Sequence, residues 1–348
     1  MGGKGGSLSS AFSCIIHIES IIMTGLSDSY QRPINYLRIS VTDRCNLRCL
    51  YCMPAEGVSL MSHNDILTYE EIHTVARAAA ELGIDKIRLT GGEPLVRVGL
   101  PKLIEMLAQI DGIEDISLTT NGLLLGRYAA ELKQAGLHRV NVSLDTLKPD
   151  RFKLITGLGT DPGEVLAGIE VARSVGLEPV KLNMVVMAGI NDDELLDFAA
   201  KTVTEDWHVR FIELMPFVGE NSPRFIPASE MRRRLEQMGE LEPCLSTKGN
   251  GPAKYFRLPN AKGTVGFITP VSEHFCFQCN RMRLTADGRL RPCLLSDYEV
   301  DLKQPLRSGI SLTGLKKLFE QAVANKPLGH QLAKGYVPKQ RPFSQVGG

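Results

Sequence analysis

The chain has 348 residues, of which 43% are hydrophobic and 23% are charged, and its formal net charge is +1. This balance is typical of a folded globular protein and excludes a disordered or collagen-like chain, and the length suffices for one large α/β barrel or two ordinary domains. A net charge near zero provides no global field for nucleic acid or a membrane surface, so local clusters of arginine and lysine must bind any anionic ligand.

The first thirty residues differ from the rest of the chain. They begin with a glycine-rich stretch, and the apolar run over 11–23 is interrupted by His17 and Glu19 and is too short to span a bilayer. No clear cleavage site follows this run, which argues against a signal peptide. We therefore expect a disordered N-terminal extension over 1–30.

From residue 36 the chain alternates strand-like and helix-like segments. Short apolar or β-branched runs predict strands at 37–41, 86–89, 115–119, 139–143, 180–186 and 209–212. Amphipathic segments predict helices at 68–82, 101–110, 122–134, 163–175 and 192–204. A capping box formed by Thr68 and Glu71 opens the first helix, and Gly83 ends it.

Six strands that alternate with helices predict an α/β fold with a parallel sheet. An open, doubly wound sheet is one arrangement of these elements. We favour a partial (β/α)6 barrel of the TIM type, because residues suited to function follow the carboxyl end of every strand, as they do in barrels.

Six of the eight cysteines form two trios. The first trio, Cys45, Cys49 and Cys52, is a C-x3-C-x2-C run directly after the first predicted strand. A four-iron cluster normally takes four thiolates, so three would leave one iron open to a small molecule. A zinc knuckle without its fourth ligand is the alternative. Clustered cysteines favour metal binding in a reducing cytoplasm over a disulfide framework.

The second trio is Cys276, Cys279 and Cys293. Asp287-Gly288 predicts a tight hairpin that folds Cys293 back toward the other two cysteines. Three sulfur ligands suit another open-iron cluster, or zinc completed by His274. We therefore predict a barrel over 31–240, followed by a C-terminal region over 241–348 with its own metal centre.

Glycines and basic residues lie at the strand ends. The run Thr90-Gly91-Gly92-Glu93-Pro94 follows the second strand, and its two glycines would let a ligand approach the backbone closely. Buried parallel strands are usually apolar, so charges on and beside them suggest contact with a ligand, and converging cations suit a polyphosphate. These cations are Arg38, Lys86, Arg88, Lys181, Arg281 and Arg283. Solvated strand ends are the alternative, which is strongest for Lys86.

The cysteine run resembles that of the radical S-adenosylmethionine (SAM) enzymes. From residue 32 onward the chain resembles the GTP 3′,8-cyclase family, which acts in molybdenum cofactor biosynthesis. The residues that carry this resemblance are Thr42-Asp43-Arg44-Cys45, TGGEPL, LTTNG, VNVSLD, Arg281-x-Arg283 and the terminal Gly347-Gly348. Only the N-terminal extension departs from the family's pattern.

The resemblance implies two [4Fe–4S] clusters, one on each cysteine trio, and SAM as the second cofactor. It implies that SAM is bound by Tyr51, Gly92, Ser143 and Met215. Ser143 could equally be a helix cap, and a methionine such as Met215 is more often a core residue. GTP would be bound by Arg38, Lys86, Arg88, Thr119, Lys181, Arg281 and Arg283. The residues that would poise GTP for reaction are Arg281, Arg283, Gly347 and Gly348.

The implied reaction is that of a lyase. A 5′-deoxyadenosyl radical would take the hydrogen from ribose C3′, and the C3′ radical would attack guanine C8 to give (8S)-3′,8-cyclo-7,8-dihydroguanosine 5′-triphosphate. The resemblance also implies a cyclic pyranopterin monophosphate synthase that takes the product, an electron donor such as flavodoxin or ferredoxin, and a cytoplasmic homodimer that contacts neither nucleic acid nor membrane.

Two rival functions stay open. A radical SAM enzyme that matures a peptide would generally need more than three C-terminal cysteines and would have no need for Arg281-x-Arg283 or a final Gly-Gly. A non-catalytic zinc or iron–sulfur scaffold would instead bind a protein partner. Elemental analysis separates these functions, because two clusters require about eight irons per chain.

Overall fold

The computed structural model describes residues 25–54, 56–157, 161–217, 223–245, 249–338 and 341–347. Its strands are β1 (Tyr36–Ser40), β2 (Lys86–Thr90), β3 (Asp115–Thr120), β4 (Arg139–Ser143), β5 (Lys181–Val186), β6 (His208–Glu213), β7 (Glu242–Cys244), β8 (Lys254–Arg257), β9 (Thr264–Ile268), β10 (Arg281–Leu284), β11 (Arg289–Arg291) and β12 (Val300–Asp301). In the described part of the chain they form one sheet in the order β12-β11-β10-β1-β2-β3-β4-β5-β6-β9-β8-β7.

Helices follow most of the central strands. They are α1 (Tyr69–Ala80), α2 (Leu100–Ala108), α3 (Leu125–Gln134), α4 (Pro149–Thr156), α5 (Pro162–Ser174), α6 (Leu195–Thr204), α7 (Ala228–Leu235), α8 (Lys303–Arg307) and α9 (Leu312–Ala324). The capping box of α1 is confirmed, since Glu71 N donates to Thr68 Oγ1 at 3.1 Å and Thr68 N donates to Glu71 Oε2 at 2.8 Å. Gly83 follows this helix at φ +90°, which glycine adopts without strain.

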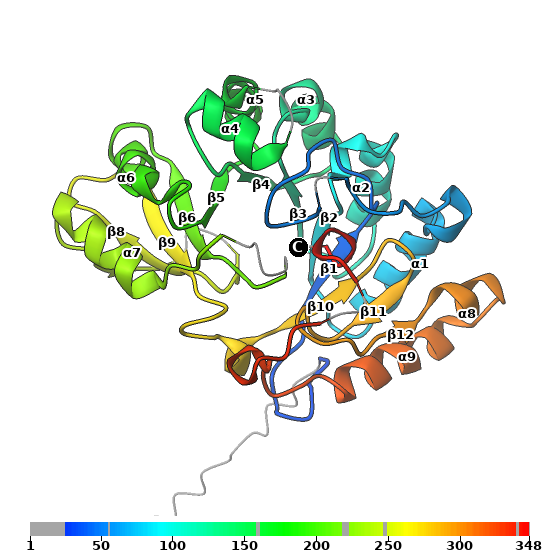
Figure 1. The fold of residues 1–348 in the computed structure, drawn as a ribbon. Coiled ribbons are helices and arrows are strands. Elements are labelled where there is room, and N and C mark those ends of the chain that lie inside the picture. The colour runs from blue at the N-terminus through cyan, green and yellow to red at the C-terminus, as the bar shows by residue number, and fades with distance from the viewer. Residues whose placement is uncertain are drawn as a thin grey trace, which may run out of the picture.

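The six central strands form the wall of the predicted partial barrel. Each pairs in parallel with the next, from β1 through β6. Figure 1 shows that this sheet is curved, with α1 to α5 on its outer side. The α/β barrel is therefore confirmed, and each of the six strands differs from its predicted range by at most one residue at either end.

Period-two alternation along these strands separates the core from the barrel interior. In β1, Leu37 and Ile39 are fully buried in the hydrophobic core, and Arg38 between them points to the opposite side. The same alternation places Ile87 and Leu89 of β2 in the core on either side of Arg88. Apolar residues thus pack the sheet against its helices, while the polar positions are left to face the barrel interior.

The chain after residue 250 extends both edges of the barrel. β10 pairs in parallel with β1, and β9 pairs in parallel with β6. β10 and β11 form the predicted antiparallel hairpin around Asp287-Gly288. One continuous sheet therefore crosses the predicted boundary at residue 240, and the division into 31–240 and 241–348 stays a prediction.

The predicted N-terminal extension lies outside the described residues up to residue 24. Residues 25–30 contact the barrel, because Leu26 N donates to Leu82 O at 3.0 Å and Asp28 forms a buried ion pair with Arg32 at 2.6 Å. Within the part of the chain that the structure describes, no helix has the length and apolar character that a membrane crossing requires.

Candidate active site

A cavity of about 320 Å³ lies inside the barrel and extends from the amino ends of β1, β4 and β5 to the loops that follow the central strands. All six cysteines of the two trios line it, together with basic side chains from the strands. The trios are more than 220 residues apart in sequence. The second trio flanks the start of β10, which pairs in parallel with β1, so it lies beside the amino end of β1. The first trio lies in the loop after the carboxyl end of β1, so the cavity runs between the two trios.

The loop that carries Cys45, Cys49 and Cys52 is held from two sides. Arg48 N donates to Thr156 O at 2.7 Å, and Leu50 N donates to Ile155 O at 3.0 Å, which attaches the loop to the end of α4. On the other side, Asn121 Nδ2 donates to Asn46 Oδ1 at 2.8 Å. The three thiols are therefore positioned by backbone that neighbouring elements hold in place.

The first trio provides three sulfur donors from one loop. Burial raises the pKa of Cys45 to about 11 and that of Cys52 to about 12, so these thiols need a cationic centre to become thiolates. Across the described ranges, no three His, Cys, Asp or Glu side chains lie close enough together to hold a metal ion. The donor set of three thiols on one loop fits a four-iron cluster that leaves one iron open.

The second trio lies among cations. Burial alone would raise the pKa of Cys279, but Arg281 and Lys326 lower it to about 6. Lys326 is itself buried and donates to Arg281 O at 2.7 Å and to Pro292 O at 2.5 Å. His274, the fourth ligand in the zinc alternative, packs its ring 5.4 Å from that of His330. The surroundings of the second trio thus favour a thiolate at Cys279.

The four residues that the resemblance assigns to SAM all line the cavity. Gly92 N donates to Thr42 O at 2.8 Å, and a Cβ on Gly92 would lie 2.7 Å from the Arg44 carbonyl carbon, so only glycine fits there. Tyr51 Oη donates to Asp145 Oδ2 at 2.8 Å, which ties the first cysteine loop to the end of β4. Ser143 is the last residue of β4, and Met215 lies two residues after the end of β6. The structure brings these residues together, and their role in SAM binding stays a prediction.

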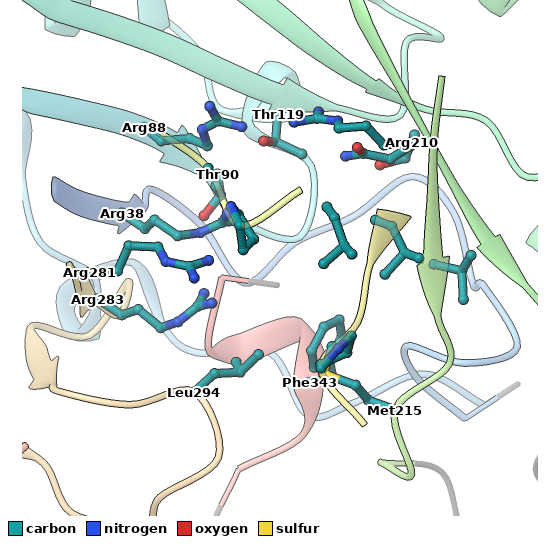
Figure 2. Close-up of a pocket in the computed structure, with 18 of the residues that line it drawn as sticks. Arg38, Arg88, Thr90, Thr119, Arg210, Met215, Arg281, Arg283, Leu294 and Phe343 are labelled. Atoms are coloured by element: carbon teal, nitrogen blue, oxygen red, sulfur yellow. The ribbon is translucent and has the colours of Figure 1, made fainter. Parts of the chain in front are cut away.

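Three arginines form a row across neighbouring strands. The register places Arg283 of β10 beside Arg38 of β1, and Arg38 beside Arg88 of β2. Burial, and then the nearby Arg283, lower the pKa of Arg38, and burial lowers that of Arg283 to about 10. Figure 2 shows the side chains of Arg38, Arg281 and Arg283 extending toward one region. Because buried like charges repel, this row favours the binding of an anion.

Several buried polar atoms in the cavity lack a protein partner. Among the described residues, Arg88 Nε, Arg281 Nε, Thr119 Oγ1 and Asn183 Oδ1 are buried without one. All four residues line the cavity. Because buried polar groups in proteins are nearly always hydrogen-bonded, these atoms indicate that a polar ligand completes the site.

Not every predicted GTP-binding residue lies at the cavity. Lys86 is not among its described lining residues, and its Nζ forms an ion pair with Asp85 at 3.0 Å. Lys181 does line the cavity, and burial, followed by Arg210 and Arg139, lowers its pKa to about 7.

Two arginines that line the cavity, Arg139 and Arg210, were not predicted from the sequence. Arg210 donates to Asn141 Oδ1 at 2.7 Å, and Arg139 is paired with Asp115. Both lie on parallel strands, and a charge on a parallel strand is the signal that identified Arg38.

The C-terminal tail enters the cavity region. Arg283 Nη1 donates to Gly347 O at 2.7 Å, and Gly347 has φ +68°. Its Cβ, if present, would lie 2.7 Å from Thr90 Oγ1, so this position requires glycine. Gly348, predicted to act with Gly347, lies outside the described residues.

Solved structures with the same architecture contain bound SAM. The crystal structure of Streptococcus suis SuiB bound to S-adenosylmethionine matches with a TM-score of 0.59 and 14% identity, over 90% of this chain and 76% of that one. Native anSMEcpe with bound AdoMet matches with a TM-score of 0.54 and 17% identity, over 87% and 83% of the two chains. At these identities the likeness shows the fold alone.

Sequence comparison identifies the family. Residues 39–201 match the radical SAM superfamily, and residues 207–332 match the family described as Molybdenum Cofactor Synthesis C. The GTP 3′,8-cyclase of Moorella thermoacetica is 54% identical over 325 residues, which cover 93% of this chain and 100% of that protein. The GTP 3′,8-cyclase of Pelotomaculum thermopropionicum is 54% identical over 328 residues, with the same coverage. The chain therefore belongs to the GTP 3′,8-cyclase family of the radical SAM superfamily.

Proposed function

We propose that this protein is a radical SAM GTP 3′,8-cyclase of molybdenum cofactor biosynthesis. The observation that carries the proposal is the single cavity that all six trio cysteines and the basic residues of the barrel line together. The buried row of arginines favours a polyanionic substrate over a peptide, and a cavity between the two trios favours a small-molecule substrate over a protein partner. A nucleoside triphosphate fits both features, because its phosphates match the cations and its base can reach the second trio.

The donor sets fit two clusters and SAM. Cys45, Cys49 and Cys52 would hold the cluster that binds SAM, and Cys276, Cys279 and Cys293 would hold the second cluster. When bound, the clusters and SAM supply an electron and the 5′-deoxyadenosyl radical that takes the hydrogen from ribose C3′ of GTP. The C3′ radical of GTP would attack guanine C8, and one electron from the electron donor together with one proton would then give (8S)-3′,8-cyclo-7,8-dihydroguanosine 5′-triphosphate.

The protein's own residues bind and orient the two small molecules. The turn at Gly92, with Tyr51, Ser143 and Met215, would hold SAM against the first trio. The triphosphate would lie along the arginine row and reach Lys181, which offsets the repulsion among these buried cations. Thr119 Oγ1, which is buried without a partner among the described residues, would donate to or accept from GTP.

Arg281 and Arg283 are the residues that would poise GTP for the reaction. Both lie on β10, directly after Cys279, so one short segment presents a cluster ligand and two cations to the same cavity. Arg283 also holds Gly347 O, which brings the tail to the substrate.

The proposal extends to partners and location. The product would pass to a cyclic pyranopterin monophosphate synthase, and an electron donor such as flavodoxin or ferredoxin would reduce the first cluster. Oxygen-sensitive clusters on clustered cysteines suit a reducing cytoplasm. We also propose a homodimer, which analytical ultracentrifugation of the cluster-loaded protein would test.

The activity is tested by anaerobic incubation of the cluster-loaded protein with SAM, a reductant and GTP. We expect 5′-deoxyadenosine to form faster with GTP than without it, together with a cyclised product of unchanged mass that mass spectrometry and chromatography separate from GTP. ATP in place of GTP is the matched control, because it keeps the triphosphate and ribose but changes the base. If 5′-deoxyadenosine forms no faster with GTP than without it, the proposed function is wrong.

A further inference from the structure

The described C-terminal tail, residues 341–347, begins with an arginine held by two carboxylates. Arg341 Nε donates to Glu299 Oε2 at 2.9 Å, and its Nη2 donates to Glu299 Oε1 at 3.0 Å. The other carboxylate is that of Asp287, which accepts from Arg341 Nη1 at 3.1 Å and from Nη2 at 2.8 Å. The three side chains are 12%, 19% and 15% exposed for Arg341, Glu299 and Asp287, so water screens these bonds only partly.

The two carboxylates are themselves fixed by other residues. Thr285 Oγ1 donates to Asp287 Oδ1 at 2.6 Å, and Arg291 Nη1 donates to Glu299 Oε2 at 2.9 Å. Asp287 lies in the turn between β10 and β11, and Glu299 directly precedes β12. These two contacts do not involve the tail, so they hold both carboxylates independently of Arg341 and lower the entropy cost of binding it.

The far end of the same tail is attached to the same hairpin. Gly347 O accepts from Arg283 Nη1, and Arg283 lies on β10. Between the two attachments, Ser344 and Val346 are buried, and the ring of Phe343 lies 4.7 Å from that of Phe217. Figure 1 shows the turn at Phe343–Gln345, in red, inside the curve of the sheet. The tail is thus stretched between the turn end of the β10–β11 hairpin and the arginine on β10 that lines the cavity.

We propose that Arg341 is a positioning residue for the cyclase reaction, which seats the tail on Asp287 and Glu299 so that Gly347 reaches Arg283. Arg341 is not among the described residues that line the cavity, so it acts through the tail and not on the substrate. The inference rests on the proposed function for its effect on catalysis. The seating of the tail itself does not depend on which reaction the cavity performs.

The test compares Arg341→Ala with the wild-type, cluster-loaded protein by hydrogen–deuterium exchange and by turnover. The amides of Gln345 and Val346 report on the tail, because they donate to Pro342 O at 3.0 Å and to Phe343 O at 3.2 Å. We expect Arg341→Ala to raise their exchange rates at least tenfold and to lower cyclised product per 5′-deoxyadenosine, while iron content stays unchanged. Arg341→Lys keeps the charge but loses the planar fork, and we expect exchange between that of the wild type and that of Arg341→Ala.

Arg307→Ala is the matched control. Arg307, on α8, also bonds one carboxylate through two nitrogens, to Glu71 at 2.7 and 3.2 Å. Its other hydrogen bonds go to Asn64 O and Ile66 O and none goes to the described tail. We expect this variant to leave both the exchange of the tail and the product ratio unchanged. A general loss of stability would instead affect both variants alike.

The outcomes separate the two proposals. Unchanged exchange at Gln345 and Val346 in both Arg341 variants would show that the arginine does not seat the tail. Faster exchange with an unchanged product ratio would show that the seat has no part in the reaction. A wild-type protein that forms no product with GTP would refute the proposed function, while the exchange data would still decide the seating. If Arg341→Ala loses iron, the proposal is decided with Arg341→Lys by the same two measurements, which are exchange at Gln345 and Val346 and cyclised product per 5′-deoxyadenosine.

Discussion

Replacing Gly92 with alanine tests whether the turn after β2 is built for close approach to SAM. A Cβ at Gly92 would lie 2.7 Å from the Arg44 carbonyl carbon and 3.0 Å from Asp43 O, and both are backbone atoms that cannot rotate away. Gly92 N and Glu93 N also bond the same segment, to Thr42 O and Arg44 O at 2.8 Å each. The turn and the start of the cysteine loop must therefore separate to admit the methyl group.

The magnitude follows from the cost of such overpacking, which is about 1–3 kcal/mol. Most of this cost arises from distortion of the turn and the cysteine loop that SAM would contact, so we expect the Kd for SAM to rise by a factor of about 5 to 150. The hydrophobic core lies on the other side of the sheet, and we expect the melting temperature to fall by only a few degrees.

The assay is anaerobic equilibrium dialysis with labelled SAM, with iron content measured on the same samples. Gly126→Ala is the matched control, because its Cβ would lie 3.5 Å from Gly168 Cα, which is ordinary van der Waals contact. A Gly92→Ala protein that keeps its iron and binds SAM within twofold of the wild type would refute the reasoning.

Three further predictions concern the cavity. Asp115→Asn removes the carboxylate partner of Arg139 in a pair only 8% and 12% exposed, so we expect the free energy of unfolding in urea to fall by about 3–5 kcal/mol, and a loss below 1 kcal/mol would contradict this. Lys181 has a pKa lowered to about 7, chiefly by burial, so it must gain a proton to bind a polyanion above that pH. Affinity for GTP should therefore weaken as pH rises from 6.5 to 8.5. Calorimetry should show that the Kd for GTP depends less on pH in Lys181→Met than in the wild type. An equal pH dependence in the two proteins would show that Lys181 does not bind GTP. Cys279→Ser should lower iron from about eight to about four per chain and leave the first cluster's spectrum unchanged, whereas undiminished iron or bound zinc would count against the second cluster.

The strands and most helices of the central barrel could be predicted from the sequence because the patterns that indicate them are local. Runs of β-branched and apolar residues ended at glycines and caps, and the capping box at Thr68 and Glu71 is present as predicted. Helix α4 was not predicted, since Pro149–Thr156 carries only a short apolar pattern. The pairing of β10 with β1 and of β9 with β6 also escaped prediction, because it joins segments about 60 to 245 residues apart with no local signal.

The candidate site was predicted in outline but not in every residue. The rule that a charge on a buried parallel strand faces a ligand identified Arg38 and Arg88, and applied evenly it would also have found Arg139 and Arg210. The same rule selected Lys86, which lies at the start of β2 and pairs with Asp85. The attachment of Arg341 to Asp287 and Glu299 could not be predicted, because only the folded hairpin brings the two carboxylates together.

The transfer of deuterium from GTP labelled at ribose C3′ tests the central claim most directly. The cluster-loaded protein would be incubated anaerobically with SAM, reductant and [3′-²H]GTP, and the 5′-deoxyadenosine analysed by mass spectrometry. The account predicts 5′-deoxyadenosine that carries one deuterium, because the cavity between the two trios holds C3′ toward the radical. 5′-Deoxyadenosine formed at the full rate without deuterium would contradict it.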